Sequence, residues 1–317
     1  MKILVTGSSG HLGEALMRVL RKEGKEVLGI DILPSPYTDQ TGSIADRNFV
    51  RKNMKGITHV LHAATLHKPH VATHEQQQFI DTNITGTLNL LEASVENGVR
   101  SFIFTSTTST FGDALTPRPD TPAAWITEEV VPIPKNIYGV TKTAAEDICQ
   151  LFYRNHKLPC LVLKTSRFFP EEDDDNSIAT NYADANAKAN EYLYRRIDTE
   201  DVVSAHLLAM EKARQIGFGK YIISATTPFE KNHLHALRKN AHEVVKSLYP
   251  DFEKIYARLG WKMFPAIGRV YVNKKAREEL GWLPKYDFLY ILNKLKAGAD
   301  FKSELSGVIG SKGYHRS

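Results

Sequence analysis

The sequence has little of what marks secreted, membrane or metal-binding proteins. Its 317 residues include two cysteines, Cys149 and Cys160, in apolar or helical settings without metal-ligand spacing. We therefore expect buried thiols in a reducing cytoplasm. No apolar run approaches the length that spans a bilayer, so no membrane association is expected. The start of the chain reaches a glycine turn at Gly7, so we expect no secretory signal there.

The charge pattern excludes another class of partner. A formal net charge of +5 is modest for this length, and lysines and arginines are interleaved with acids. Nucleic-acid binding requires a basic stripe, so no nucleic-acid partner is expected. The acidic run from Glu171 to Asp175 is interpreted as a solvated loop, with an acidic lid near the substrate as the alternative. His70 and His74 could hold a metal on a helix, but no carboxylate or thiol motif completes a site, and we expect none.

What the sequence does contain begins at its N-terminus. Lys2 to Thr6 reads as a buried strand, and an amphipathic helical pattern follows a glycine turn of the form G-x-x-G-x-x-G at residues 7–13. Such a turn lets the backbone approach a diphosphate, which then faces the free N–H groups of the helix. A second strand ends at Asp31, where an acid accepts hydrogen bonds from the ribose diol of NAD. A solvated strand-end aspartate is the alternative reading of Asp31.

Alternating strands and helices continue through most of the chain. Further buried strands are predicted at 58–64, 101–105, 158–163 and 220–225, with helices at 75–97, 137–155 and 198–210 between them. This alternation predicts an α/β fold, a doubly wound parallel sheet of the Rossmann type. Residues 113–136 contain five prolines and are interpreted as a loop passing over the site. A short β-like piece is expected at 269–272.

The chemistry is expected from one helix face. Tyr138 and Lys142 are four residues apart, which places both side chains on the same side of a helix. An ammonium beside a phenol favours the phenolate, so the pKa of Tyr138 is predicted to fall toward neutral pH. The phenol could then exchange a proton with a substrate hydroxyl. Chance occurrence of this pair on an amphipathic helix is the competing interpretation.

Taken together, these motifs resemble the extended short-chain dehydrogenase/reductase superfamily, in particular its NAD-dependent nucleotide-sugar epimerase and dehydratase branch. The resemblance covers most of the chain. It is carried by Thr6-Gly7-x-x-Gly10-x-x-Gly13, Asp31, His62-Ala63-Ala64, Asn83-Ile84-Thr85-Gly86-Thr87, Phe111-Gly112, Tyr138-x-x-x-Lys142, Asp201-Val202-Val203 and the segment Ala276 to Pro284.

The resemblance implies roles for individual residues. Tyr138 is expected to be the acid/base, Lys142 to bind the nicotinamide ribose and lower the pKa of the tyrosine, and Thr107, with Thr108 as its rival, to bind the reacting hydroxyl. Asn83 is expected to be a structural asparagine near NAD, and Lys68, with His67 as the alternative, a pyrophosphate-side cation. The expected NAD-binding set is Gly7, Gly10, His11, Leu12, Gly13, Asp31, Ile32, Ser43, Ile44, Ala63, Ala64, Thr65, Lys68, Asn83, Thr105, Tyr138, Lys142 and Thr165.

Two departures from the family pattern bear on the substrate. Thr108 and Ser109 stand where 4,6-dehydratases carry an Asp-Glu pair, which argues against dehydration. Arg167 replaces an asparagine that helps hold a nucleotide diphosphate, and with Thr107 and Thr108 it forms the expected substrate-binding set. Arginine clamps phosphates and carboxylates in a bidentate fork, so this departure is compatible with an anionic substrate, with a smaller sugar or sugar acid as the competing substrate.

Three functions remain open from the sequence: an epimerase of a nucleotide sugar, favoured first; a net dehydrogenase of a free sugar or sugar acid; and a non-catalytic dinucleotide sensor.

The predicted domain division is an NAD-binding Rossmann domain at 1–166, to which 198–226 return, a mostly helical substrate-binding cap at 167–197 and 227–306, and a tail at 307–317. The tail is expected to be partly disordered or to order against a partner subunit. The resemblance also implies a homodimer through helices 75–97 and 137–155.

Overall fold

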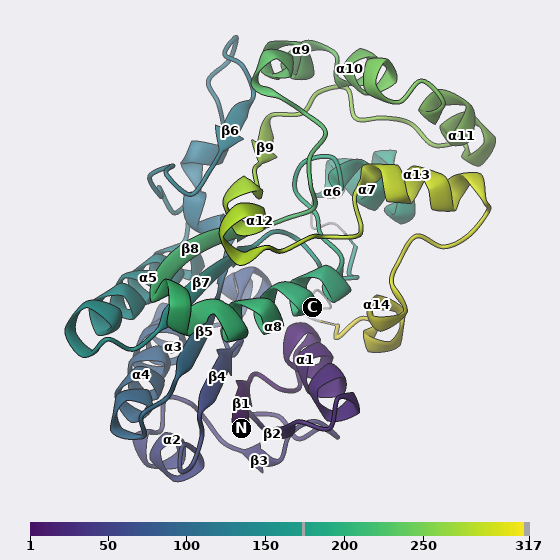
Figure 1. Ribbon diagram of the computed structural model, residues 1–317. Helices are drawn as coiled ribbons and strands as arrows, with labels where there is room; N and C mark the ends of the chain where they lie inside the picture. The colour runs from purple at the N-terminus through teal and green to yellow at the C-terminus, as the bar shows by residue number, and fades with distance from the viewer. Residues whose placement is uncertain (173–174, 314–317) are drawn as a thin grey trace.

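A twisted parallel sheet forms the centre of the lower half of the molecule in Figure 1. The computed structural model describes residues 1–172 and 175–313. The sheet has seven strands in the order β3-β2-β1-β4-β5-β7-β8, and all adjacent pairs are parallel. The strands are β1 (Lys2–Thr6), β2 (Glu26–Asp31), β3 (Gln40–Thr41), β4 (His59–His62), β5 (Ser101–Thr107), β7 (Cys160–Thr165) and β8 (Phe218–Ile223).

Helices cover both faces of this sheet, as the alternation of buried residues along β1 requires. Ile3 and Val5 pack in one apolar cluster with helices α1 and α8, whereas Leu4 packs in another with α2, α4 and α5. Figure 1 shows α8 and α1 on the near side and α2, α4 and α5 behind the strands. The bounds of these helices are α1 (His11–Lys22), α8 (Thr199–Ile216), α2 (Arg47–Asn53), α4 (Gly86–Glu96) and α5 (Ile137–His156).

The predicted helix at 75–97 is interrupted by one wide turn. A short α-helix, α3 (Gln76–Phe79), passes into a π-helical segment, Ile80–Thr85, and then into α4. Such π-helical turns occur frequently at functional sites. Here the segment contains the buried Asn83.

A second apolar core lies beyond the carboxyl ends of the strands, at the top of Figure 1. Two short strands, β6 (Ala124–Ile126) and β9 (Arg269–Tyr271), pair in parallel beneath it. Because β6 lies within the proline-rich segment, the prediction of a plain loop over 113–136 is wrong for these residues. The helices of this cap are α6 (Asn176–Asn181), α7 (Asp184–Glu191), α9 (Leu234–Lys239), α10 (Ala241–Leu248), α11 (Phe252–Leu259) and α13 (Phe288–Lys296).

Two late helices return to the sheet half. Helix α12 (Lys274–Leu280) packs against α8 and β8, and the buried Trp282 donates from its indole N–H to Ser204 of α8 at 3.0 Å. Helix α14 (Glu304–Ile309) packs against α1 and α8. Part of the predicted cap segment at 227–306 therefore lies against the Rossmann half.

The predicted fold class is confirmed: a Rossmann-type parallel sheet flanked by helices, with a helical C-terminal region. The predicted strands occur with ends that differ from the prediction by at most two residues, while β3 and β6 had not been expected. Among the helices in the described part of the chain, none combines the length and the apolar character needed to cross a membrane.

Candidate active site

The turn between β1 and α1 is shaped by two glycines that no larger residue can replace. Gly7 has a φ of +73°, a conformation that residues with a side chain rarely adopt. A Cβ on Gly13 would lie 1.8 Å from the carbonyl oxygen of Gly7. The absence of both side chains lets the turn fold closely onto the start of α1, whose first N–H groups have no partner within the helix. This backbone cradle fits the diphosphate of a dinucleotide.

Asp31 lies at the end of β2, beside this turn. Its carboxylate accepts hydrogen bonds from the backbone N–H of Ser9 at 3.0 Å and of Leu33 at 2.9 Å, so the local backbone fixes its orientation. A carboxylate has about four acceptor positions, which leaves capacity for a ribose diol. The residues present therefore fit NAD.

One cleft of about 380 Å³ runs along the carboxyl ends of the strands, and most residues of the predicted NAD-binding set line it. The predicted residues in its lining are Gly7, Gly10, His11, Leu12, Gly13, Asp31, Ile32, Ser43, Ile44, Ala63, Ala64, Thr65, Thr105, Tyr138 and Thr165. Three others lie elsewhere. Lys68 lines a neighbouring cavity, while Lys142 and Asn83 are buried behind the cleft wall.

Tyr138 lies where this cleft meets the second cavity, because its side chain lines both. The hydroxyl of Tyr138 forms a hydrogen bond with Thr107, which favours the phenolate. Burial is the larger effect and raises the pKa of Tyr138 to about 12. The predicted fall of this pKa toward neutrality is therefore wrong for this structure.

The physical reason lies with Lys142. Its Nζ donates to the carbonyl oxygen of Thr105 at 2.7 Å and sits 3.9 Å from the centre of the Phe104 ring. Burial lowers the pKa of Lys142 to about 7, although the carboxylate of Glu146 acts in the opposite direction. The lysine is thus held beneath the end of β5 and does not offset the desolvation of the phenol.

Asn83 ties the loop after β4 to the tyrosine helix. Its side-chain oxygen accepts from the backbone N–H of Leu66 at 2.9 Å and from the hydroxyl of Thr65 at 2.9 Å. Its amide group donates to the carbonyl oxygen of Leu66 and to the hydroxyl of Thr141, both at 3.0 Å. All of these contacts are made within the protein, so in this structure Asn83 supports the wall of the cleft from behind.

The second cavity, of about 210 Å³, is rich in positive charge. Four cationic side chains line it together with Tyr138, Thr107 and Thr108, and its described lining contains no carboxylate. These four cations are Lys68, Arg167, Arg195 and Arg269. The predicted substrate residues Thr107, Thr108 and Arg167 are thus brought together beside the tyrosine.

The backbone explains how arginines distant in sequence converge here. Beyond β7, Arg167 forms a parallel β-bridge with Arg196. The backbone N–H of Arg167 donates to the carbonyl oxygen of Arg195 at 3.1 Å, and the backbone N–H of Ile197 donates to the carbonyl oxygen of Arg167 at 3.0 Å. The buried carboxylate of Glu191 lies within 3.5 Å, 2.5 Å and 2.7 Å of the guanidinium groups of Arg167, Arg195 and Arg196. Although burial acts against ionisation, these cations lower the pKa of Glu191 to about 2.

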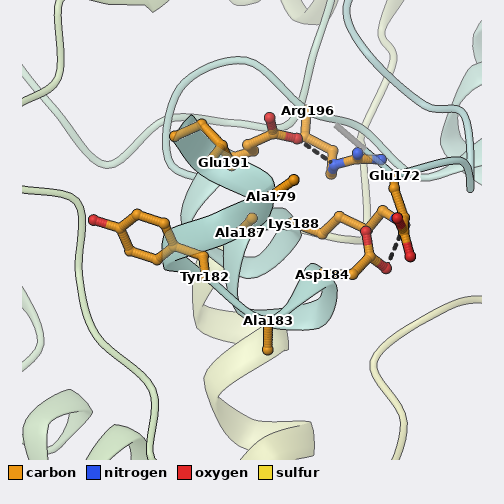
Figure 2. Close-up of a pocket in the computed structure, with 10 residues that line it drawn as sticks. Glu172, Ala179, Tyr182, Ala183, Asp184, Ala187, Lys188, Glu191 and Arg196 are labelled. Atoms are coloured by element: carbon orange, nitrogen blue, oxygen red, sulfur yellow. Dashed lines mark hydrogen bonds and ion pairs between the residues drawn. The ribbon is translucent and has the colours of Figure 1, made fainter. Parts of the chain in front are cut away.

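A further cavity lies on the other side of Glu191, and four of its charged side chains form ion pairs with one another. Figure 2 shows Arg196 directed at Glu191 and Lys188 directed at Asp184. Lys188 also donates to the carbonyl of Pro170. The single carboxylate of Glu191 therefore forms ion pairs with three arginines, which leaves excess positive charge in the cavity that Tyr138 lines.

The first acid of the predicted solvated run is not solvated. Glu171 is buried, and its carboxylate lies 3.0 Å from Nε2 of His11 at the start of α1. Burial raises the pKa of this carboxyl, but the hydrogen bonds from His11 and from the backbone N–H of Lys312 outweigh it and lower the pKa to about 2. The prediction of a solvated loop is wrong for Glu171, while 173–174 lie outside the described residues.

The same contacts order the start of the predicted tail. Ser311 donates to Glu171 at 3.1 Å, and the ammonium of Lys312 binds the carboxylate of Glu14 on α1. Residues 307–313 therefore pack on their own chain. Residues 314–317 lie outside the described part.

Sequence reasoning missed several residues that line the two cavities. The largest omissions are Arg195 and Arg269, which come from segments with no motif of their own. Phe168 and Phe169, directly after Arg167, line both cavities. The pair Arg195-Arg196 ahead of a predicted helix was the available signal, but periodicity does not show which cavity such a pair faces.

The fold and the site define an NAD-dependent enzyme of the extended short-chain dehydrogenase/reductase type. The sequence pattern of the family described as "NAD dependent epimerase/dehydratase family" matches residues 3–223, and the chain belongs to this family. Solved structures agree. A UDP-glucose 4-epimerase from Thermotoga maritima with UDP-glucose is 26% identical, with a TM-score of 0.64 over 93% of this chain and 96% of that one.

Other similar proteins share the fold or part of the sequence. A short-chain dehydrogenase/reductase superfamily protein from Agrobacterium tumefaciens with bound NAD has the same fold, at 22% identity and a TM-score of 0.68 over 94% of this chain and 96% of that one. A UDP-glucuronate 4-epimerase from Thermodesulfobacterium geofontis is 31% identical over 52% of this chain and 54% of its own length. The chain spans 36% to 56% of the length of the first three curated relatives it matches.

Proposed function

We propose that this protein is an epimerase of a nucleotide sugar of the UDP-hexose kind, acting through reversible oxidation of one sugar hydroxyl. The observation that carries the proposal is the position of Tyr138, hydrogen-bonded to Thr107 where the cleft with the NAD-binding pattern meets the cationic cavity. The family assignment and the similarity to UDP-sugar epimerases support it.

In this proposal Tyr138 takes the proton of the reacting hydroxyl, and Thr107 holds that hydroxyl in line. NAD supplies the hydride acceptor when bound. A tyrosine with a pKa of about 12 needs neighbouring positive charge to act as a base near neutral pH. Lys142 alone does not offset the desolvation of the phenol, so the oxidised nicotinamide ring would add the missing positive charge when NAD is bound.

The proposed substrate is anionic because the cavity that would hold it is cationic. Lys68, Arg167, Arg195 and Arg269 face it without a carboxylate among the described lining residues. Guanidinium groups form paired hydrogen bonds with both phosphate and carboxylate oxygens. A nucleoside diphosphate sugar satisfies this charge, and so does a sugar acid.

A net NAD-dependent dehydrogenase of a sugar acid is the second candidate. One observation favours it: Arg167 stands at the position from which the family's asparagine is expected to hold the nucleotide diphosphate. In the structure this arginine lies beside Tyr138 in the same cavity. A carboxylate close to the reacting carbon could be bound there.

The two candidates are separated by the fate of the hydride. The purified protein is first analysed by mass spectrometry for released NAD, then incubated with UDP-hexoses and with free uronic acids while NADH absorbance is followed. Retained NAD with sugar interconversion and no net NADH supports the epimerase. Steady NADH formation from a uronic acid supports the dehydrogenase, and no reaction with either class contradicts both.

We further propose a homodimer in a reducing cytoplasm. Ile80, Val140 and Leu151 are exposed apolar residues on the segments through which family members are expected to dimerise. Cys149 and Cys160 are free, buried and in hydrogen-bond contact with each other. Light scattering after gel filtration tests the dimer: a monomer mass at micromolar concentration would contradict it.

A further inference from the structure

A buried carboxylate on the tyrosine helix is not used by the chemistry described so far. Tyr138, Lys142 and Glu146 follow one another at four-residue intervals along α5 and lie on one face of the helix. Glu146 has no exposed surface. A charge buried this deeply is costly unless it is paired and hydrogen-bonded, so its partners indicate its purpose.

The partners of Glu146 come from three neighbouring strands. The hydroxyl of Ser106 on β5 donates to Oε1 at 2.5 Å. The ammonium of Lys164 on β7 donates to both carboxylate oxygens, at 2.7 Å and 2.9 Å, and Lys220 on β8 approaches Oε2 at 3.2 Å. The carboxylate thus fixes the helix to the ends of these strands.

The contact with Ser106 matters because of the residues on either side of it. Thr105 accepts the hydrogen bond from Lys142, and Thr107 is the hydrogen-bond partner of Tyr138. The carbonyl of Ser106 also accepts from the hydroxyl of Thr165 at 3.0 Å. The contact that fixes the Ser106 side chain therefore also fixes the positions of Thr105 and Thr107 relative to Lys142 and Tyr138.

The charge of Glu146 also acts on Lys142. The groups that face this lysine are Glu146 and Cys149 on α5, Lys164 on β7 and His62 on β4. Glu146 is the carboxylate among them and favours the ammonium, whereas Lys164 disfavours it. Burial holds the pKa of His62 well below its usual value, so that histidine is neutral at physiological pH.

We propose that Glu146 is a positioning residue for the active site: it fixes the end of β5 through Ser106 and provides a counter-charge that favours the ammonium form of Lys142. The inference rests on the proposed roles of Tyr138 and Lys142. Its test needs no sugar, so a wrong substrate assignment would leave the result intact.

The test is a lysine-selective ¹³C NMR titration of the full chain, without and with saturating NAD⁺. The Lys142 resonance is assigned by its disappearance in Lys142→Arg. In Glu146→Gln the titration midpoint of Lys142 should fall by about one pH unit or more, a tenfold change in its protonation equilibrium. Glu146→Asp, which keeps the charge, should restore most of the midpoint.

A second variant acts in the opposite direction and does not remove the carboxylate. Lys220→Met removes an ammonium that approaches Oε2 of Glu146 at 3.2 Å and leaves Glu146 less neutralised, so the midpoint of Lys142 should rise. This variant decides the question if Glu146→Gln does not fold, which a circular dichroism melt shows. An unchanged Lys142 midpoint in the folded variants would overturn the proposal, because a carboxylate with only a packing role would not move it.

Discussion

The active site has two halves, the NAD-binding cleft and the cationic cavity, and they are lined by different kinds of groups. The half lined by Gly7, Gly13 and Asp31 uses backbone groups, small residues and strand ends that lie close together in sequence. The half lined by Arg167, Arg195 and Arg269 uses long charged side chains from three separate segments. Rigid backbone geometry suits a cofactor common to a family, whereas side chains can change from one substrate to another without altering the fold.

Tyr138 is the residue that the two halves share, because its side chain lines both cavities. Tyr138→Phe removes the hydroxyl that bonds Thr107 but keeps the ring, so turnover should fall by about 10²- to 10⁴-fold while NAD binding remains. Turnover by sugar analysis and NAD affinity by calorimetry provide the two readouts. Full activity in this variant would remove Tyr138 from the mechanism.

The cationic half should govern substrate affinity alone. Arg269→Met should raise KM for the anionic substrate by roughly 10- to 100-fold, since a charged hydrogen bond contributes about 1.5–3 kcal/mol. NAD affinity should not change, because Arg269 does not line the larger cleft. The exposed cap residue Lys239 supplies the matched control, and Lys239→Met should leave KM unchanged. An equal loss of NAD affinity in Arg269→Met would break the distinction between the halves.

The backbone-built half should govern cofactor choice. Asp31→Ala should weaken NAD by about tenfold and NADP by less, because a carboxylate accepts from the ribose diol but repels a 2′-phosphate. Asp31→Asn keeps a similar shape and separates the charge from the hydrogen-bond geometry. Fluorescence titration with both dinucleotides measures the preference. An unchanged ratio of the two affinities would take Asp31 out of the cofactor site.

The smallest expected effect concerns the contact that joins α1 to the segment after β7. The pKa of Glu171 is lowered to about 2, from an ordinary value of 4.5 in the unfolded chain. Its ionised form therefore stabilises the fold fully above about pH 4.5. This stabilisation is lost as pH falls from about 4.5 to 2. Glu171→Gln should therefore lower Tm by a few degrees at pH 7, with the difference shrinking in acid. A Tm difference independent of pH would contradict the ion pair with His11.

The same contrast explains what the sequence could and could not predict. The glycine turn, Asp31, Thr107 and Tyr138 lie at strand or helix ends, where local pattern fixes position, and the structure places them in the lining of the two adjoining cavities. The positions of Arg269 and Glu191 depend on tertiary contacts, which the hydrophobic periodicity of the sequence does not predict. The fall of the Tyr138 pKa was predicted from spacing alone and failed, since burial outweighs a lysine that is directed at Thr105.

The most direct measurement of the central claim is the fate of the transferred hydrogen. The protein is incubated with UDP-glucose and UDP-glucuronate in D₂O, and the products are analysed by mass spectrometry while NADH absorbance is recorded. The proposal predicts conversion between epimers, no net NADH and no solvent deuterium at the epimerised carbon. Accumulating NADH, or deuterium at that carbon, would contradict a closed hydride cycle at Tyr138.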